Sequence, residues 1–389
     1  MTTNHDLEAT WTYHDSTKHS LQSVRSSRHY LDWGNQPLAF KIYSTLDSLP
    51  LPQDFPPVSM SALSAIAMRG GTREQACTPT LPTLATLLFL SAGITKRRTY
   101  PGGEIYFRAA ACTGALYHID LYLVCGDLPE LSAGVYHFGP HDFSLRRLRT
   151  GDYRGILANA VGHEQSVVNA PLTVVCTSTY WRNAWKYQAR TYRHCFWDAG
   201  TLIANFLAAA AGLHLPTQVV AGFVDTTVNQ LLDLDTDREV ALALLPLGYT
   251  AQQVSATSSD MSPLALPTVP LSQSEVEYPA IRTMHAASSF VTETEVTAWR
   301  GKSPTTPDTA LHGQLFPLLP LAESVLPPLS LDQVIRHRGS ARAFARQPIT
   351  FAQLSTILQR STQGVPADCL DPFGTTLTEL YLIVNAVEV

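Results

Sequence analysis

The chain has 389 residues, of which 45% are hydrophobic, so it can bury a sizeable core in one large domain or two smaller ones. Its 27 Lys and Arg against 32 Asp and Glu give a net charge of −5 without a long basic block, which argues against a nucleic-acid partner. The six cysteines are scattered, with no CxxC pair and no Cys/His ligand spacing. We therefore predict reduced thiols in a cytoplasmic protein, and no metal site.

The N-terminal residues 1–57 are rich in turn formers and predict an extended arm. The arm begins with a polar stretch that lacks the apolar run of a signal peptide. A helical pattern follows over 59–74, and a second, apolar helix is predicted over 81–93, ending at a glycine as helices often do. Two helices are therefore expected before the first strand.

A complete α+β module is predicted over 58–250. Its strands are runs rich in β-branched and aromatic residues, and one pair forms a hairpin around Gly139 and Pro140. The strand regions are 115–127, 134–148, 170–179 and a last one that ends near Gly248. A single long helix is predicted over 185–213. Its apolar part, 201–215, is about five residues too short for a bilayer, so it predicts a buried core helix and no membrane span.

Residues 251–326 are rich in Ser, Thr and Pro, with one helical patch at 292–300, and predict a linker or wrapping segment. After the linker the chain repeats itself. Residues 327–342 resemble 56–73, and "TELYLIV" at 378–384 resembles the predicted strand "IDLYLVC". We therefore predict a partial second module over 327–389. Equivalents of the later hairpin, long helix and closing strand do not follow, so we expect this sequence to be a fragment of a longer tandem protein.

Both copies of the repeat carry two arginines four residues apart with small residues between them. Small residues let a backbone approach an anion closely, and guanidinium groups match phosphate oxygens. The recurrence at the same place favours a phosphate site, although solvated arginines at a helix end remain the alternative. The motifs are Arg69-Gly70-Gly71-Thr72-Arg73 and Arg338-Gly339-Ser340-Ala341-Arg342.

The stretch 185–200, "WKYQARTYRHCFWDAG", carries three cations at spacings of four and three. On one helix Lys186, Arg190 and Arg193 would share a face, just before the apolar run. Their partner could be a bound anion, a substrate, or only water and carboxylates.

Taken in order along the chain, these motifs resemble the nitroreductase superfamily. They resemble most closely its SagB-type, thiazole/oxazole-forming peptide dehydrogenases in tandem-domain form. The likeness covers about residues 11–250 and resumes at 327, and it rests on "YHDSTKHS", the arginine motif, "ACTGALYH" in place of "PSAGALYP", "GVYHF" and "KYQARTYRHCFWDAG". It implies an α+β fold, a three-layer α/β/α sandwich with a mainly antiparallel sheet. It also implies FMN in a cleft between two modules, in an intramolecular pseudo-dimer or a homodimer.

The resemblance implies an FMN-dependent oxidation of azoline rings to azoles in a ribosomal peptide natural product. The partners it implies are a modified peptide substrate and a cyclodehydratase complex. Two alternatives stay open. One is a catalytically decayed subunit that scaffolds a peptide-modifying complex. The other is a general NAD(P)H-dependent nitro or quinone reductase.

The resemblance also assigns roles to residues. Lys186 and Tyr187 match a "KY" pair near the substrate, where one of them, with a depressed pKa, would remove the azoline Cα proton; the alternative is a packing Tyr and a solvated Lys. For Arg190 and Arg193, contact with FMN and pairing with carboxylates such as Asp198 are equally open. The residues expected to bind the cofactor are Arg69, Gly71, Arg73, Arg190, Arg193, Arg338, Ser340 and Arg342.

Several positions depart from the family pattern. In the turn that lines the flavin, Ala111, Cys112 and His118 stand where Pro, Ser and Pro are usual, and a less rigid turn is expected. Thr201 stands where the "DxGH" motif has histidine, and in the second copy "DPFGTT" at 371–376 replaces the turn altogether. At most one well-formed flavin site is therefore expected.

Overall fold

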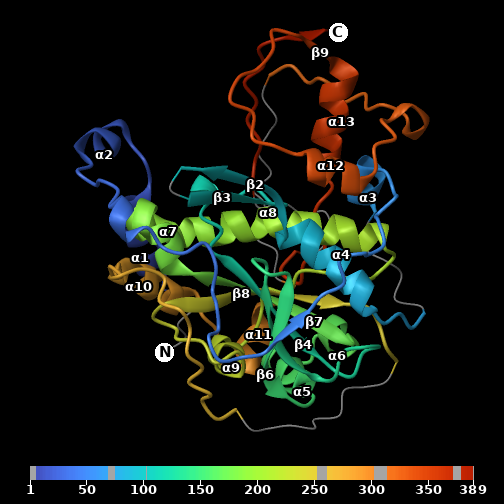
Figure 1. Cartoon of the computed structure of the whole chain (residues 1–389). Coiled ribbons are helices and arrows are strands. Elements are labelled where there is room, and N and C mark those ends of the chain that lie inside the picture. The colour runs from blue at the N-terminus through green and yellow to red at the C-terminus, as the bar shows by residue number, and fades with distance from the viewer. Residues whose placement is uncertain are drawn as a thin grey trace.

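The computed structural model describes residues 6–68, 75–101, 103–251, 261–301, 313–370 and 378–388. Its centre is a six-stranded sheet in the order β1-β6-β5-β4-β7-β8, in which every neighbouring pair is antiparallel (Figure 1). The strands are β1 (Ser48–Pro50), β4 (Ile119–Cys125), β5 (Gly134–Gly139), β6 (Ser144–Thr150), β7 (Leu172–Thr179) and β8 (Glu239–Leu247). The predicted hairpin and the predicted antiparallel character of the sheet are both confirmed.

Helices cover both faces of this sheet, which gives three layers (Figure 1). Side chains of β4 alternate between two cores: Leu121 and Leu123 join the core beneath one helical layer, whereas Tyr122 and Val124 join the other. The first layer contains α3 (Ala62–Ala67), α4 (Leu81–Ala92) and α8 (Thr191–Gly212). The second contains α5 (Arg154–Ala160), α6 (Gln165–Val168), α9 (Asp225–Leu231) and α11 (Glu293–Trp299).

The N-terminal arm is more regular than predicted. It begins with α1 (Leu7–Thr17) and α2 (Leu21–Ser26), followed by the short 3-10 helix η2 (Trp33–Asn35). The carboxylate of Asp6 accepts a hydrogen bond from the amide of Ala9 and so caps α1. The buried residues of α1 are Tyr13 and Thr17, an apolar face too small to produce a helical pattern in the sequence.

The helix predicted over 185–213 is two helices. α7 (Tyr180–Tyr187) ends in a 3-10 turn, η4 (Gln188–Arg190), and α8 begins at Thr191. Gln188 has φ +53°, a left-handed backbone conformation that no helix interior adopts. Neither glycine nor proline marks this break, so the sequence pattern runs through it.

Within the part of the chain that is described, the segment Tyr180–Gly212 is long and apolar enough to cross a membrane by length and composition alone. In its most apolar window 56% of residues are buried inside the protein, and α8 packs against both the sheet and α4. This packing is that of a core helix, as the sequence predicted.

A two-stranded hairpin that the sequence did not predict, β2 (Ile94–Tyr100) paired with β3 (Gly103–Arg108), lies over α8 (Figure 1). The Ser/Thr/Pro-rich segment after β8 wraps the module, since Tyr43 forms a bridge with Thr268. This segment contains α10 (Pro279–Ser288), which was not predicted, and α11, which was.

The second copy of the repeat packs on the first. Its elements are η5 (Glu323–Val325), α12 (Leu331–His337), β9 (Ile349–Thr350), α13 (Phe351–Ser361) and β10 (Val387–Glu388). Ser61 caps α3 and Ser330 caps α12, and the backbones of these two equivalent serines form an isolated antiparallel β-bridge. The flanking hydrogen bonds are reciprocal, from Ala62 N to Leu329 O at 3.0 Å and from Leu331 N to Met60 O at 2.9 Å. The two copies are therefore related locally by a two-fold axis.

The strand predicted at 378–384 is not a strand in the structure. These residues are exposed and extended, with Tyr381 88% and Ile383 92% exposed. Their counterpart β4 lies between β5 and β7, whereas no described strand pairs with 378–384. A strand needs a neighbour to satisfy its backbone groups, which explains the difference.

Candidate functional site

The candidate site is built around the turn at residues 111–118, which joins β3 to β4 and contains the 3-10 helix η3 (Thr113–Ala115). Gly114, Ala115 and Tyr117 all have positive φ, between +49° and +68°, so the backbone curls tightly. A Cβ atom on Gly114 would lie 2.9 Å from the hydroxyl of Tyr187. The turn therefore brings its backbone closer to Tyr187 than any residue with a side chain would allow.

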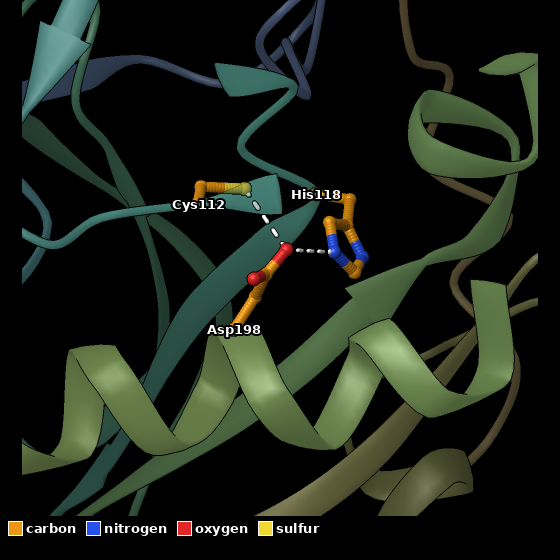
Figure 2. Close-up of side chains that lie close together, drawn as sticks. All are labelled: Cys112, His118 and Asp198. Carbon is orange, nitrogen blue, oxygen red and sulfur yellow. Dashed lines mark hydrogen bonds and ion pairs between the residues drawn. The ribbon is translucent and has the colours of Figure 1, made fainter. Parts of the chain in front are cut away.

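The turn is fastened to α8 by the carboxylate of Asp198 (Figure 2). Oδ1 accepts hydrogen bonds from the amide of Thr113 at 3.0 Å and from its hydroxyl at 2.8 Å. Oδ2 lies 3.1 Å from the Sγ atom of Cys112 and 2.8 Å from Nε2 of His118. Three residues of the turn thus converge on one carboxylate.

His118 is fully buried, and its Nδ1 lies 2.8 Å from the hydroxyl of Ser178 on β7. Burial lowers the pKa of His118 although the neighbouring Asp198 raises it. Burial, together with Asp198, raises the pKa of the Cys112 thiol. Burial alone would raise the pKa of Asp198, but the hydrogen bond and charge of His118 and the bonds from Cys112 and Thr113 outweigh it, so the net direction is downward.

These directions keep Asp198 ionised and Cys112 a thiol at neutral pH. Because the Cys112 thiol donates to a carboxylate, the charge next to it disfavours a thiolate. Cys112 is therefore not placed as a nucleophile in this arrangement.

The residues that depart from the family pattern link the turn to α8. The side chains of Cys112 and His118 both contact the Asp198 carboxylate. The hydroxyl of Thr201 donates to the carbonyl of Ala111 at 2.6 Å. A less rigid turn was expected, and in the structure side chains of α8 contact it at both ends. The place of the "DxGH" histidine is taken by Thr201, while His118 reaches the aspartate of that motif from the turn itself.

A buried ion pair supports the turn from its other side. Arg182 of α7 pairs with Asp120 of β4, and its guanidinium also donates to the carbonyl of Tyr117 at 2.9 Å. Arg108, at the end of β3, is buried too, and burial and the nearby Arg182 lower its pKa to about 10.

Of the two predicted catalytic residues, Tyr187 is the one that the structure brings to the turn. Its ring packs edge-on against the His194 ring, with the two ring centres 4.6 Å apart, and its hydroxyl faces Gly114. Lys186 lies next to it, with Nζ 5.5 Å from the centre of the Tyr187 ring. Burial, with Asp198 and Cys112 nearby, raises the pKa of Tyr187, which is the opposite of the depression expected for a base.

Arg190 and Arg193 hold the N-terminal helix. Arg190 donates to the carbonyl of Thr17, and Arg193 donates to the Thr17 hydroxyl at 3.0 Å and to the carbonyl of His14 at 2.9 Å. Both cations thus lie at the C-terminal end of α1, where the helix dipole favours them. The alternative of a pair with Asp198 is not realised, because the Asp198 carboxylate is occupied by residues of the turn.

The arginine motif of the second copy reaches the turn of the first. Arg338 donates to the carbonyls of Arg108 and Ala109, the residues that lead into the turn, at 3.2 Å each. Ser340 and Arg342 are exposed on the same segment. Arg69, Gly71 and Arg73 of the first copy, and the whole "DPFGTT" segment of the second, lie outside the described residues.

The outer side of α8 next to the turn is open. Phe196 is 46% and Trp197 52% exposed, and a Cβ atom on Gly200 would meet no other atom within 4 Å. A small cavity of about 20 Å³ lies beside the turn, lined among others by Arg108, Cys112 and Asp198.

The sequence did not predict the cluster of Cys112, His118 and Asp198. Residues 112 and 198 are far apart in the chain. Neither the spacing from Cys112 to His118 nor that from His118 to Asp198 forms a known ligand motif. The signal that was available is the simultaneous replacement of two turn residues by Cys and His. In the described part of the chain these three also have ligand atoms that all lie within 4.8 Å of one another, as in a metal site.

Comparison with known proteins identifies this region. The nitroreductase family model matches residues 107–249. A protein of Methanocaldococcus jannaschii named as a nitroreductase is 27% identical over 181 residues, which are 46% of this chain and 86% of that protein. The microcin B17-processing protein McbC of Escherichia coli is 26% identical over 144 residues, 36% of this chain and 49% of McbC.

Among solved structures, one named as a nitroreductase from Anabaena variabilis superposes with a TM-score of 0.65 at 25% identity. The match covers 91% of this chain and 68% of that one. It confirms the predicted fold class, with its three layers and mainly antiparallel sheet.

Proposed function

Starting from the premise that residues 107–249 form a nitroreductase family domain, we propose that this oxidoreductase is FMN-dependent and of the SagB type, oxidising azoline rings to azoles in a modified peptide. The observation that carries the proposal is the turn at 111–118, fastened to α8 by Asp198 with the Tyr187 hydroxyl against Gly114. The name of McbC, a microcin-processing protein, supports a peptide as substrate.

The residues present fit a flavin. The backbone of the turn is exposed at Gly114 and Ala115, next to the Tyr187 hydroxyl, so a flat group could lie against this backbone. Arg338 lies where the turn begins, so Arg338, Ser340 and Arg342 would hold the phosphate. In this arrangement one site is shared between the turn of the first copy and the arginines of the second.

Bound FMN would supply a two-electron acceptor for the hydride that leaves the azoline ring. The chain must then remove one proton from the neighbouring carbon. Lys186 is the residue proposed to take this proton, because Tyr187, whose pKa is raised, stays protonated at neutral pH. Tyr187 is instead proposed to donate a hydrogen bond that orients substrate or flavin over Gly114.

Flavin titration of the full-length chain tests the cofactor assignment. We expect the double substitution of Arg338 and Arg342 to alanine to weaken FMN binding at least tenfold, because two phosphate ligands are lost. Arg346→Ala, an exposed arginine of the same segment, is the matched control and should bind FMN as the wild type does. Equal affinity of all three proteins would refute the assignment.

A synthetic peptide that contains one azoline tests the reaction. Lys186→Ala should lower kcat by two orders of magnitude or more, whereas Tyr187→Phe should act more mildly. Wild-type protein that binds FMN but leaves the azoline unchanged would contradict the SagB-type activity.

A general NAD(P)H-dependent nitro or quinone reductase is the second candidate, and the M. jannaschii relative's name favours it. Steady-state reduction of a quinone by NADPH, in the absence of any peptide, would distinguish the two. The remaining alternative, a decayed scaffolding subunit, was motivated by the altered turn, the missing histidine and Gly71. The altered turn supports it less, because Asp198 and Thr201 hold that turn, whereas Gly71 lies outside the described residues.

The division of the chain is part of the proposal: an arm over 1–57, a complete module over 58–250, a linker over 251–326 and a partial module over 327–389. The reciprocal hydrogen bonds around Ser61 and Ser330 support an intramolecular pseudo-dimer. A cytoplasmic location and a complex with a cyclodehydratase are proposed with it, and co-purification with such an enzyme would test the complex.

A further inference from the structure

We propose that Cys112, His118 and Asp198 form a Zn²⁺ site that fastens the turn at 111–118 to α8. The three residues supply a sulfur, an imidazole nitrogen and a carboxylate oxygen, the ligand types that zinc prefers. They come from the start of the turn, its end and the middle of α8 (Figure 2). The inference does not depend on flavin binding.

The hydrogen bonds behind His118 allow its Nδ1 to carry the proton when a metal is bound. Cys195 donates its S–H to the carbonyl of Thr191 at 3.3 Å, and the hydroxyl of Ser178 donates to the Cys195 sulfur at 3.2 Å. The Ser178 oxygen then has a lone pair with which to accept from Nδ1 of His118, 2.8 Å away. In a neutral imidazole with its proton on Nδ1, Nε2 carries a lone pair for a metal.

Without a metal, Nε2 of His118 lies 2.8 Å from Oδ2 of Asp198, a distance at which Nε2–H donates to the carboxylate. With the proton on Nδ1 instead, Nε2 would direct its lone pair at a cation bound by the same oxygen. A bound metal ion therefore needs only the other tautomer of a neutral imidazole.

Each of the three ligands has an outer hydrogen-bond partner, as metal ligands usually have. Ser178 contacts Nδ1 of His118. The hydroxyl of Thr113 donates to Oδ1 of Asp198, and the amide of Thr113 lies 3.0 Å from both oxygens of that carboxylate. The amide of Tyr117 donates to the sulfur of Cys112 at 3.0 Å, a contact that stabilises a thiolate. All three outer partners are therefore already in place.

The spacing of the two ligand atoms around Asp198 Oδ2 needs little change. Tetrahedral zinc places neighbouring ligand atoms about 3.3–3.6 Å apart. The observed separations from Asp198 Oδ2 are 2.8 Å to His118 and 3.1 Å to Cys112, so each pair would open by about half an ångström. The adjoining cavity of about 20 Å³, lined by Cys112 and Asp198, has room for one water as the fourth ligand.

Zinc binding at this site releases one proton, that of the Cys112 thiol, to solvent, while His118 stays neutral. No electrons are transferred. The ion replaces the hydrogen bonds among the three side chains by stronger bonds to the metal.

Cobalt titration of chelator-treated full-length protein tests the site. Co²⁺ accepts the same ligands as Zn²⁺, and a thiolate bound to it absorbs in the near ultraviolet. We expect a sulfur-to-cobalt band that saturates at one equivalent and disappears when one equivalent of Zn²⁺ is added. Protein that develops no such band would overturn the proposal.

The matched variants are Cys112→Ser and Cys77→Ser, because both cysteines are free and partly buried. Cys112→Ser should lose the band and weaken Zn²⁺ binding by 10- to 100-fold, whereas Cys77→Ser should behave as the wild type. Equal binding by Cys112→Ser and wild type would refute the assignment.

Alkylation of the wild-type protein keeps the test decisive if Cys112→Ser fails to fold. Zn²⁺ should slow the reaction of iodoacetamide with Cys112 at least tenfold, measured by peptide mass spectrometry, and leave Cys77 unaffected. Equal alkylation of Cys112 with and without Zn²⁺ would overturn the site. Because the readout is metal and thiol chemistry, a protein that binds no flavin can still pass or fail it.

Discussion

The hydroxyl of Thr201 donates to the carbonyl of Ala111 at 2.6 Å and so ties the third turn of α8 to the start of the candidate flavin turn. The same hydroxyl also lies 2.9 Å from the carbonyl of Asp198. One side chain therefore links the helix that carries Asp198 to the segment that Asp198 itself binds.

Thr201→Val should lower the free energy of unfolding by about 1 kcal/mol, because it leaves the carbonyl of Ala111 without its donor. Thr201→Ser keeps the hydroxyl and should cost less than half as much. Urea unfolding of the two variants and the wild type measures both effects. Equal stability of Thr201→Val and wild type would mean that the hydrogen bond contributes nothing to the fold.

Gly114→Ala should destabilise the protein by about 1–3 kcal/mol. The new Cβ would lie 2.9 Å from the Tyr187 hydroxyl, and φ is +68°. Removing that hydroxyl first, in Tyr187→Phe, should make the same substitution less costly, and a double-mutant cycle gives the coupling.

Gly200→Ala is the matched control, because a Cβ there meets nothing within 4 Å and the residue lies inside α8. This substitution should leave stability unchanged or raise it by up to about 1 kcal/mol. A Gly114→Ala protein as stable as Gly200→Ala would contradict the close contact between the turn and Tyr187.

Arg193→Ala should loosen α1, because Arg193 donates to both Thr17 and His14 at the end of that helix. We expect amide exchange in α1 to rise at least tenfold while the sheet stays protected. Lys18→Ala is the control: Lys18 pairs only with the exposed Asp15 and should change exchange little. If amide exchange in α1 were the same in Arg193→Ala as in Lys18→Ala, other contacts would hold this helix.

Asp225 should make the protein less stable as the pH rises. Burial raises its pKa to about 7, above its value in an unfolded chain, so the folded state binds the extra proton. The loss of unfolding free energy from ionising the buried carboxyl is absent below about pH 4, grows between pH 4 and pH 7, and is complete above pH 7.

Asp225→Asn should remove this slope, because asparagine cannot ionise yet can still accept from the amide of Phe290, now 2.8 Å from the carboxylate. The difference in unfolding free energy between variant and wild type should grow by roughly 2–3 kcal/mol from pH 5 to pH 8. Chemical denaturation at pH 5, 6, 7 and 8 measures it. A constant difference would show that Asp225 ionises normally in the folded protein.

Local patterns in the sequence predicted the sheet and its hairpin, because β-branched runs bounded by turn residues mark strands. The break at Gln188 escaped prediction, because neither glycine nor proline marks it. The α1 helix escaped for another reason: it buries little more than Tyr13 and Thr17, and its position depends on Arg190 and Arg193, far away in the chain.

The candidate site was predicted only in part. The resemblance selected Tyr187, and the structure places it at the turn. It also selected Arg190 and Arg193, whose guanidiniums the structure turns toward α1. The convergence of Cys112 and His118 on Asp198 depends on how α8 packs across the turn, and such packing is not written in any spacing of residues along the chain.

The reciprocal hydrogen bonds between Ala62 and Leu329 and between Leu331 and Met60 have a consequence for how the two copies diverge. In a symmetric assembly of identical subunits, every substitution appears twice, so each subunit must keep a complete set of binding groups. Two copies in one polypeptide escape that constraint: one half can specialise in the turn and the other in the arginines. Gly71 in one motif and Ser340 in the other are the kind of asymmetry that such a division of labour permits.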